Sequence, residues 1–270
     1  MNGAQRLTSV LAGLMVVQSS LGLAFPAQYR DDEWIRATWH SNDWVTLTVA
    51  VPLLLIGRAR AGRGAGWGLL LWLGVTGYAA YNYGFYLFGA ALNAFFLLYV
   101  AALVVAAAIL IVALPAVDAG AAAARFRPMI SPRLLGGYFV LVALALTSAW
   151  VSMWAAYVFA GRPTPVEPDA FRLVAALDLS VMVPLLALGG SLLWRQGAWG
   201  VVTCAIAGVQ ASIYLLVLSA NAVVAIERGL AAAPGELPVW GPLFVVTLIA
   251  TVALFSGVVD STTAGRPADG

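Results

Sequence analysis

Two carboxylates, Asp43 and Asp178, lie within or at the edge of apolar stretches, where an ionised side chain is costly unless it faces protein or water. Asp178 precedes Trp194 by 16 residues. At about 1.5 Å per residue, that places it roughly 24 Å from the inner end of its helix, in the outer quarter of a membrane. Asp43 lies about one turn shallower. His40 precedes Asp43 by one helical turn, so an imidazole–carboxylate pair able to move a proton is one possibility.

Polar and aromatic residues recur at helical spacing in two further apolar segments, each set on one helix face. They are Tyr78, Asn82 and Tyr86 in the first segment and Gln210, Tyr214 and Asn221 in the second. All lie toward the same side as the carboxylates, whereas the other halves of these segments are mainly Leu, Val, Ala and Gly. We therefore expect a water-accessible cavity open to the outer face, lined by these six residues with Asp43, Asp178 and His40.

Each of these features also has a structural interpretation. Tyrosine and tryptophan favour membrane interfaces, so an aromatic belt accounts for part of the pattern. Asp43 fits the N-terminal end of a helix, where the helix dipole stabilises a carboxylate. Asp178 fits a structural role with Gln210 or Tyr214 as its partner. His40 fits a solvated position at the interface.

The composition excludes several classes of site. Only 10% of the 270 residues are charged and 62% are hydrophobic, whereas soluble domains carry about 25% charged residues. Every basic residue is an arginine, which excludes a lysine Schiff base. A single histidine and a single cysteine exclude bis-histidine haem ligation and a disulfide within the chain, and they disfavour a zinc site. We expect no cofactor and, without a basic patch in a soluble segment, no nucleic-acid partner.

The elements that must position these residues come in two copies. Residues 46–68 and 178–200 align at a constant offset of 132 without a gap, matching Val-Pro-Leu-Leu, a glycine, an arginine and Trp-Gly. The chain is therefore expected to be a tandem duplication of a unit of about 130 residues. Pro52 and Pro184 occupy equivalent positions inside the helices and predict the same kink in both copies.

A membrane-spanning helix needs about 20 mostly apolar residues, and eight segments of the chain meet or nearly meet this requirement, the second being the weakest. The fold expected is an all-α bundle of eight spans in two parallel four-helix repeats, 1–115 and 134–259, joined by a cytoplasmic linker at 116–133 and followed by a disordered tail at 260–270. The first segment lacks a clear cleavage site and is expected to be retained. The expected spans lie near 7–27, 41–57, 67–88, 91–115, 134–160, 171–194, 199–225 and 239–259.

Arginine placement predicts the orientation. Most arginines fall on one side, in segments such as 58–63 and 125–133, whereas acidic residues predominate on the other, for example in 31–33 and 167–169. Basic loops stay in the cytoplasm, so both termini are expected there, which requires an even number of crossings. Four crossings per copy would relate the copies by an axis along the membrane normal.

The segments 42–47, 51–54 and 81–89, together with 177–200, resemble a group of bacterial polytopic membrane proteins that carry no assigned activity. The resemblance spans most of the chain. It implies a bacterial inner-membrane protein and supplies no activity.

Three functions are compatible with the sequence. The first is a small transporter or channel-like protein for a cation, proton or small solute, with Asp178 and Asp43 as the binding carboxylates. The second is a non-transporting sensor or accessory protein that binds a ligand, a lipid or another membrane protein. The third is an enzyme acting on a lipid at the outer leaflet, with His40 and a carboxylate as acid and base. The small number of such groups makes this third function the least favoured.

Overall fold

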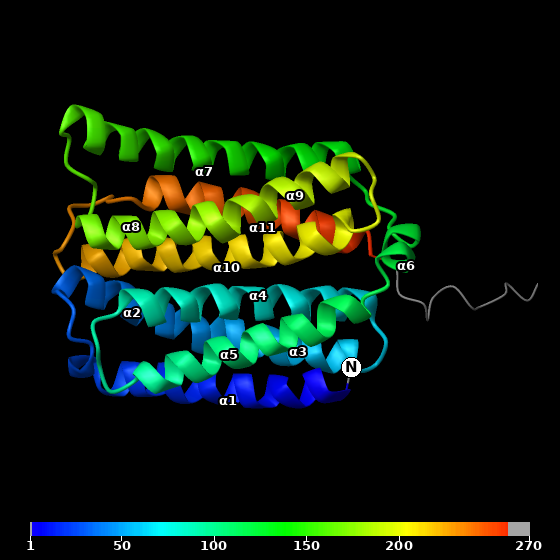
Figure 1. The fold of residues 1–270 in the computed structure, drawn as a ribbon, viewed down its shortest axis with the longest axis horizontal. Helices are drawn as coiled ribbons and strands as arrows, with labels where there is room; N and C mark the ends of the chain where they lie inside the picture. The colour runs from blue at the N-terminus through cyan, green and yellow to red at the C-terminus, as the bar shows by residue number, and fades with distance from the viewer. Residues whose placement is uncertain (1, 259–270) are drawn as a thin grey trace, which may run out of the picture.

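The structure, a computed structural model, describes residues 2–258, and all regular secondary structure in this range is helical. The long helices run between the two ends of one bundle (Figure 1). The helices are α1 (Asn2–Ala24), α2 (Glu33–Val45), α3 (Val51–Ala61), α4 (Gly66–Gly89), α5 (Phe96–Ala113), α6 (Ala119–Ala124), α7 (Pro132–Ala160), α8 (Pro168–Leu177), α9 (Val183–Trp194), α10 (Gly200–Glu227) and α11 (Leu237–Ser256). Short 3₁₀ turns lie at Pro26–Gln28 and Leu114–Ala116, and π-helical turns at Thr46–Ala50 and Asp178–Met182.

Seven helical segments in the described range are long and apolar enough to cross a membrane, so the chain is that of a multi-pass membrane protein. They comprise α1, α2 joined to α3, α5, α7, α8 joined to α9, α10 and α11. The segment expected at 67–88 is also a helix, α4, but it is not among the seven. Its tyrosines, glycines and Asn82 lower its hydropathy, and most of its residues are buried inside the bundle.

Helices α1–α5 gather on one side of the bundle and α7–α11 on the other, and α4 meets α10 between them (Figure 1). Small residues allow this central approach. A Cβ atom on Gly74 would lie 2.6 Å from Cβ of Val209, and one on Gly77 would lie 3.2 Å from Cγ2 of Ile206. Close backbone approach at glycine is a common way for membrane helices to pack. The central pair therefore depends on glycines of α4.

A proline explains the π-helical turn in each half. Pro52 has no N–H to donate to the carbonyl four residues back, and its ring crowds that carbonyl. The turn widens, and the N–H of Val51 bonds to the carbonyl of Thr46, five residues earlier. In the second half, ahead of Pro184, the N–H of Val183 bonds to the carbonyl of Asp178 in the same way. Pro52 and Pro184, predicted to distort both helices in the same way, thus each lie just after a π-helical turn.

Two further contacts recur at the same offset. A Cβ on Gly57 would lie 2.6 Å from the backbone nitrogen of Trp72, and one on Gly189 would lie 3.0 Å from that of Cys204. Thr48 donates its hydroxyl proton to the carbonyl of Trp44 at 2.7 Å, and Ser180 donates to that of Ala176 at 2.5 Å. The corresponding residues are separated by 132 positions in every case.

Several element boundaries differ from those expected. The second span begins at Glu33 rather than near 41, because Asp32 caps the helix by accepting the N–H of Ile35 at 2.9 Å. That cap lies in a polar stretch that a search for apolar residues passes over. The linker contains the short helix α6, capped by Asp118. The tail expected at 260–270 lies outside the described residues.

Both ends of the described chain meet at the same end of the bundle. The start of α1 lies there together with α6 (Figure 1). The N–H of Arg127, in the linker after α6, donates to the carbonyl of Gly257, just past α11, at 2.7 Å. We call this the α6 end, and the opposite end, with the turns at 25–32 and 161–167, the far end.

Candidate functional site

The far-end half of the first group of helices contains a buried carboxylate, Asp43, which is inaccessible to solvent. Three neutral groups donate to it: the Tyr29 hydroxyl at 2.6 Å, the Tyr86 hydroxyl at 2.9 Å and the Gln18 side-chain amide at 3.0 Å. Residues 2–258 form a single ion pair, between Arg172 and Asp169, so no cationic side chain neutralises Asp43. A buried carboxylate is tolerated only when such hydrogen bonds replace water.

The network continues through Gln18, whose carbonyl oxygen accepts the Tyr83 hydroxyl at 3.1 Å. Gly22, one helical turn further along α1, makes room for it. A Cβ there would collide with the Asp43 carboxylate and the Tyr29 hydroxyl. Gln18, Gly22 and Tyr29 were not among the predicted site residues. The polar run Gln18-Ser19-Ser20 inside an otherwise apolar segment is the signal that could have identified Gln18.

Aromatic rings surround this carboxylate. The Tyr86 ring stacks on Trp39 with centroids 4.7 Å apart and on Tyr99 at 5.0 Å. The Trp39 indole N–H donates to Asp31 at 2.9 Å, which ties the middle of α2 to the turn before the helix. Burial, reinforced by the Asp43 charge, raises the pKa of Tyr29 well above its ordinary value, so its hydroxyl stays protonated. The aromatic residues therefore exclude water and supply donors at the same time.

Asp178, at the start of the second π-helical turn, is 1% exposed. The Tyr81 hydroxyl of α4 donates to one of its oxygens at 2.5 Å, and the Trp150 indole of α7 donates to the other at 2.9 Å. These donors differ from the Gln210 and Tyr214 suggested by the sequence. Tyr214 instead packs edge-on against Tyr81, with centroids 5.4 Å apart. Asp178 therefore links α4 of the first group to α7 of the second.

The remaining predicted residues lie along the contact between α2, α4 and α10. The Tyr78 hydroxyl donates to the Asn42 side chain at 3.5 Å, and the Thr38 hydroxyl donates to Asn221 at 3.3 Å. Asn82 and Gln210 are 3% and 1% exposed, and the amide nitrogen of each is buried without a hydrogen-bond partner. The structure thus places these residues inside the bundle.

A polar pocket of about 310 Å³ opens at the far end. Tyr29 and Gly22 line it, and both also contact Asp43, so the pocket lies directly beside the buried carboxylate. The other residues that line it are Pro26, Ala27, Glu33, Arg36, His40 and Arg228. Of the predicted site residues, His40 is the one that lines this pocket.

His40 does not form the pair with Asp43 that the sequence suggested. Its Nε2 accepts the indole N–H of Trp44 at 3.2 Å. Asp43 is adjacent to Trp44 in the chain, but its carboxylate accepts hydrogen bonds from Tyr86 of α4 and from Tyr29 in the 25–32 turn. The imidazole therefore bonds to Trp44, and the carboxylate bonds to the tyrosines.

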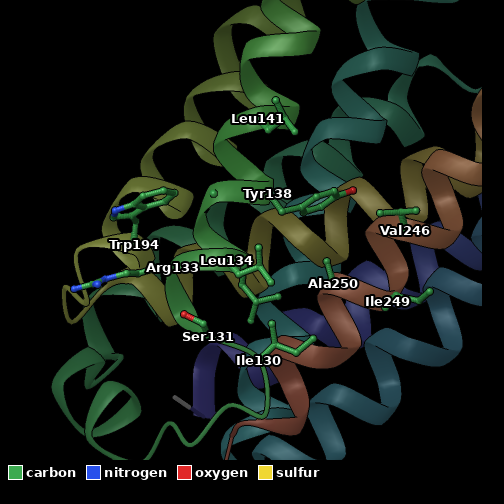
Figure 2. Close-up of a pocket in the computed structure, with 12 residues that line it drawn as sticks. Ile130, Ser131, Arg133, Leu134, Tyr138, Leu141, Trp194, Val246, Ile249 and Ala250 are labelled. Carbon is green, nitrogen blue, oxygen red and sulfur yellow. The ribbon is translucent and has the colours of Figure 1, made fainter.

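A larger groove of about 700 Å³ runs between α7 and α11 toward the α6 end (Figure 2). Its walls are almost entirely apolar, with Leu134, Leu141 and Tyr138 of α7 facing Val246 and Ile249 of α11. In a membrane such a surface faces lipid tails. Its chemistry suits apolar chains and offers little to a polar solute.

The described residues contain no group of three or more His, Cys, Asp or Glu side chains able to hold a metal ion. A scan against protein-family models and searches of curated proteins and of solved structures give no match.

Proposed function

We propose that the chain is a tandem duplication that crosses the bacterial inner membrane eight times, with both termini in the cytoplasm. The repeated π-helical turns, the paired contacts of Gly57 and Gly189, and the central α4–α10 pair support two equivalent halves. Helix α4 is 24 residues long, enough for the eighth crossing. Its polar residues are tolerated because they face protein rather than lipid. The arginine-rich linker supports a cytoplasmic α6 end.

We propose further that the protein is a small transporter whose outer access site is the far-end pocket and whose proton acceptor is Asp43. The observation that carries this proposal is the position of Asp43, a buried carboxylate with neutral partners placed directly behind a polar pocket. A carboxylate of this kind changes charge when it takes up one proton, and a charge change is what couples a proton to the movement of a solute.

Tyr29 connects the far-end pocket to the buried Asp43. Its hydroxyl donates to Asp43 at 2.6 Å, and its side chain lines the pocket. A proton arriving from water in the pocket is accepted by the hydroxyl oxygen while the hydroxyl proton passes to the carboxylate. This exchange leaves Tyr29 neutral and Asp43 protonated. The π-helical turns, which are frequent at functional sites of α-helices, supply a place in each half where the helix can bend.

Proton flux into liposomes tests this proposal. The full chain is reconstituted with a pH-sensitive dye inside, and an inward proton gradient is applied with and without mixtures of candidate solutes outside. We expect faster acidification than in empty liposomes, and its loss in Asp43→Asn. Asp169→Asn is the matched control, because Asp169 is exposed and forms a surface ion pair with Arg172. Acidification equal to that of empty liposomes under every condition would reject the transporter.

A second candidate, a non-transporting sensor or accessory protein, is favoured by one observation. The far-end pocket is lined only by residues at that end, and the described groove near the α6 end is apolar, so neither joins the two ends. A pocket of this kind can hold a ligand without passing it on. Ligand binding without flux, together with stable co-purification of another membrane protein, would favour this function over transport.

A further inference from the structure

Two residues that line the far-end pocket carry polar atoms without a hydrogen-bond partner among the described residues 2–258. The Nε atom of Arg36 and the Nδ1 atom of His40 are both buried without a hydrogen-bond partner, and both residues line the pocket. Buried polar atoms are almost always paired, so two orphans in one pocket need an explanation. A ligand that fills the pocket supplies one.

The hydrogen bond from Trp44 determines which nitrogen of the His40 imidazole carries the proton. The Trp44 indole can only donate, so His40 Nε2 must be the unprotonated, accepting nitrogen. In the neutral ring the proton then lies on Nδ1, which makes the orphan atom a donor. Arg36 Nε–H is a donor in every state, because the guanidinium does not lose its proton in proteins. Both unsatisfied atoms therefore require an acceptor.

Charge points the same way. Arg36 and Arg228 bring two guanidinium groups to the pocket, against one carboxylate, Glu33. Glu33 forms an ion pair with neither arginine, because the single ion pair among residues 2–258 joins Arg172 to Asp169. The Tyr29 hydroxyl is already donated to Asp43. The pocket thus combines unpaired positive charge, free N–H donors and an apolar wall made by Pro26 and Ala27.

We propose that this pocket binds an oxyanion, a carboxylate or phosphate carried by a small molecule, held by Arg36, Arg228 and the Nδ1–H of His40. Planar guanidinium groups match the oxygens of such anions in geometry and charge. A volume of about 310 Å³ is at the lower end for ligand sites, which limits the bound group to a small solute or to a single lipid headgroup. This inference rests on the pocket being the access site of the proposed transporter and names the chemistry of what enters it.

Equilibrium binding to the full chain in detergent and in nanodiscs tests the inference. The soluble probes are inorganic phosphate, acetate and glycerol 3-phosphate, followed by isothermal titration calorimetry. The lipid arm compares nanodiscs of phosphatidylglycerol with nanodiscs of phosphatidylcholine by lipid retention on purification. We expect a soluble anion to bind with a dissociation constant of about 1 mM or tighter.

Arg228→Gln is the decisive variant, because Arg228 lies just beyond the end of α10 and is exposed, so the fold does not depend on it. Loss of one charge-assisted hydrogen bond should weaken binding about tenfold or more. Arg36→Gln should do the same, and Arg172→Gln, an exposed arginine outside the pocket, should leave binding unchanged.

Retention of phosphatidylglycerol alone, lost in Arg228→Gln, would support the same site with a headgroup as its occupant. Failure of every probe to bind, or equal binding by the wild type and by Arg228→Gln, would overturn the inference. The result is separable from that on transport. Anion binding that persists in Asp43→Asn while liposomes show no flux would reject the transporter and retain the anion site.

Discussion

Replacing Tyr29 with phenylalanine removes one hydroxyl and little else. The ring keeps its contacts with Trp39, at 6.3 Å between centroids, and with Phe95, at 5.6 Å. The change removes the hydrogen bond to Asp43, which at 2.6 Å is the shortest of the three that the carboxylate accepts, together with the bond that the Tyr29 hydroxyl accepts from the Gln18 amide at 3.0 Å. A hydrogen bond to a charged, buried group contributes about 1.5–3 kcal/mol, so Tyr29→Phe should lower the free energy of unfolding by about 2 kcal/mol.

The control for this change is Tyr138→Phe. The Tyr138 hydroxyl on α7 pairs with that of Thr247 on α11 at 2.6 Å, a bond of the same length between neutral, partly buried groups. Its loss should cost about 0.5–1.5 kcal/mol. Both variants are compared with the wild type by reversible denaturant unfolding in mixed micelles, followed by tryptophan fluorescence.

A double-mutant cycle with Asp43→Asn identifies the partner. If the Tyr29 hydroxyl acts through the carboxylate, its removal should cost much less once Asp43 is asparagine, with a coupling of about 1 kcal/mol or more. The reasoning fails if Tyr29→Phe costs no more than Tyr138→Phe. It fails equally if the effects of the two substitutions add to within about 0.3–0.5 kcal/mol.

Three more outcomes are expected. Gly57→Ala should destabilise the protein by about 1–3 kcal/mol, because its Cβ would lie 2.6 Å from the backbone nitrogen of Trp72; unchanged denaturant unfolding would contradict that contact. Thr8→Val should cost about 1–3 kcal/mol in the same assay, because it leaves the buried Trp72 indole N–H, now 2.9 Å from the Thr8 hydroxyl, without an acceptor. In a cysteine-free background, a membrane-impermeant maleimide added to intact cells should label Thr164→Cys in the 161–167 turn but not Met129→Cys in the linker. Labelling of both or of the linker alone would refute the proposed orientation.

The helical fold could be predicted because it depends on local properties of the sequence. The backbone in lipid must satisfy its own hydrogen bonds, so every long apolar segment becomes a helix wherever it lies. The equal spacing of Pro52 and Pro184 also anticipated that both helices would be distorted alike, since a missing N–H acts on the adjacent turn. The helix start at Glu33 was missed because a cap depends on one polar residue, Asp32, outside the apolar pattern.

The sequence alone determined that this protein is a helical membrane protein with carboxylates and tyrosines gathered toward one end. It could not determine their partners, because those lie 25, 14 and 43 residues from Asp43, and 97 and 28 residues from Asp178. Only the packing of α1, α4, α7 and the 25–32 turn around the two carboxylates decided that these donors surround them. The sequence also could not locate the far-end pocket, which His40, Arg36 and Arg228 help to line. Helix periodicity fixes which face of its own helix a residue occupies, but not which neighbouring helix that face meets.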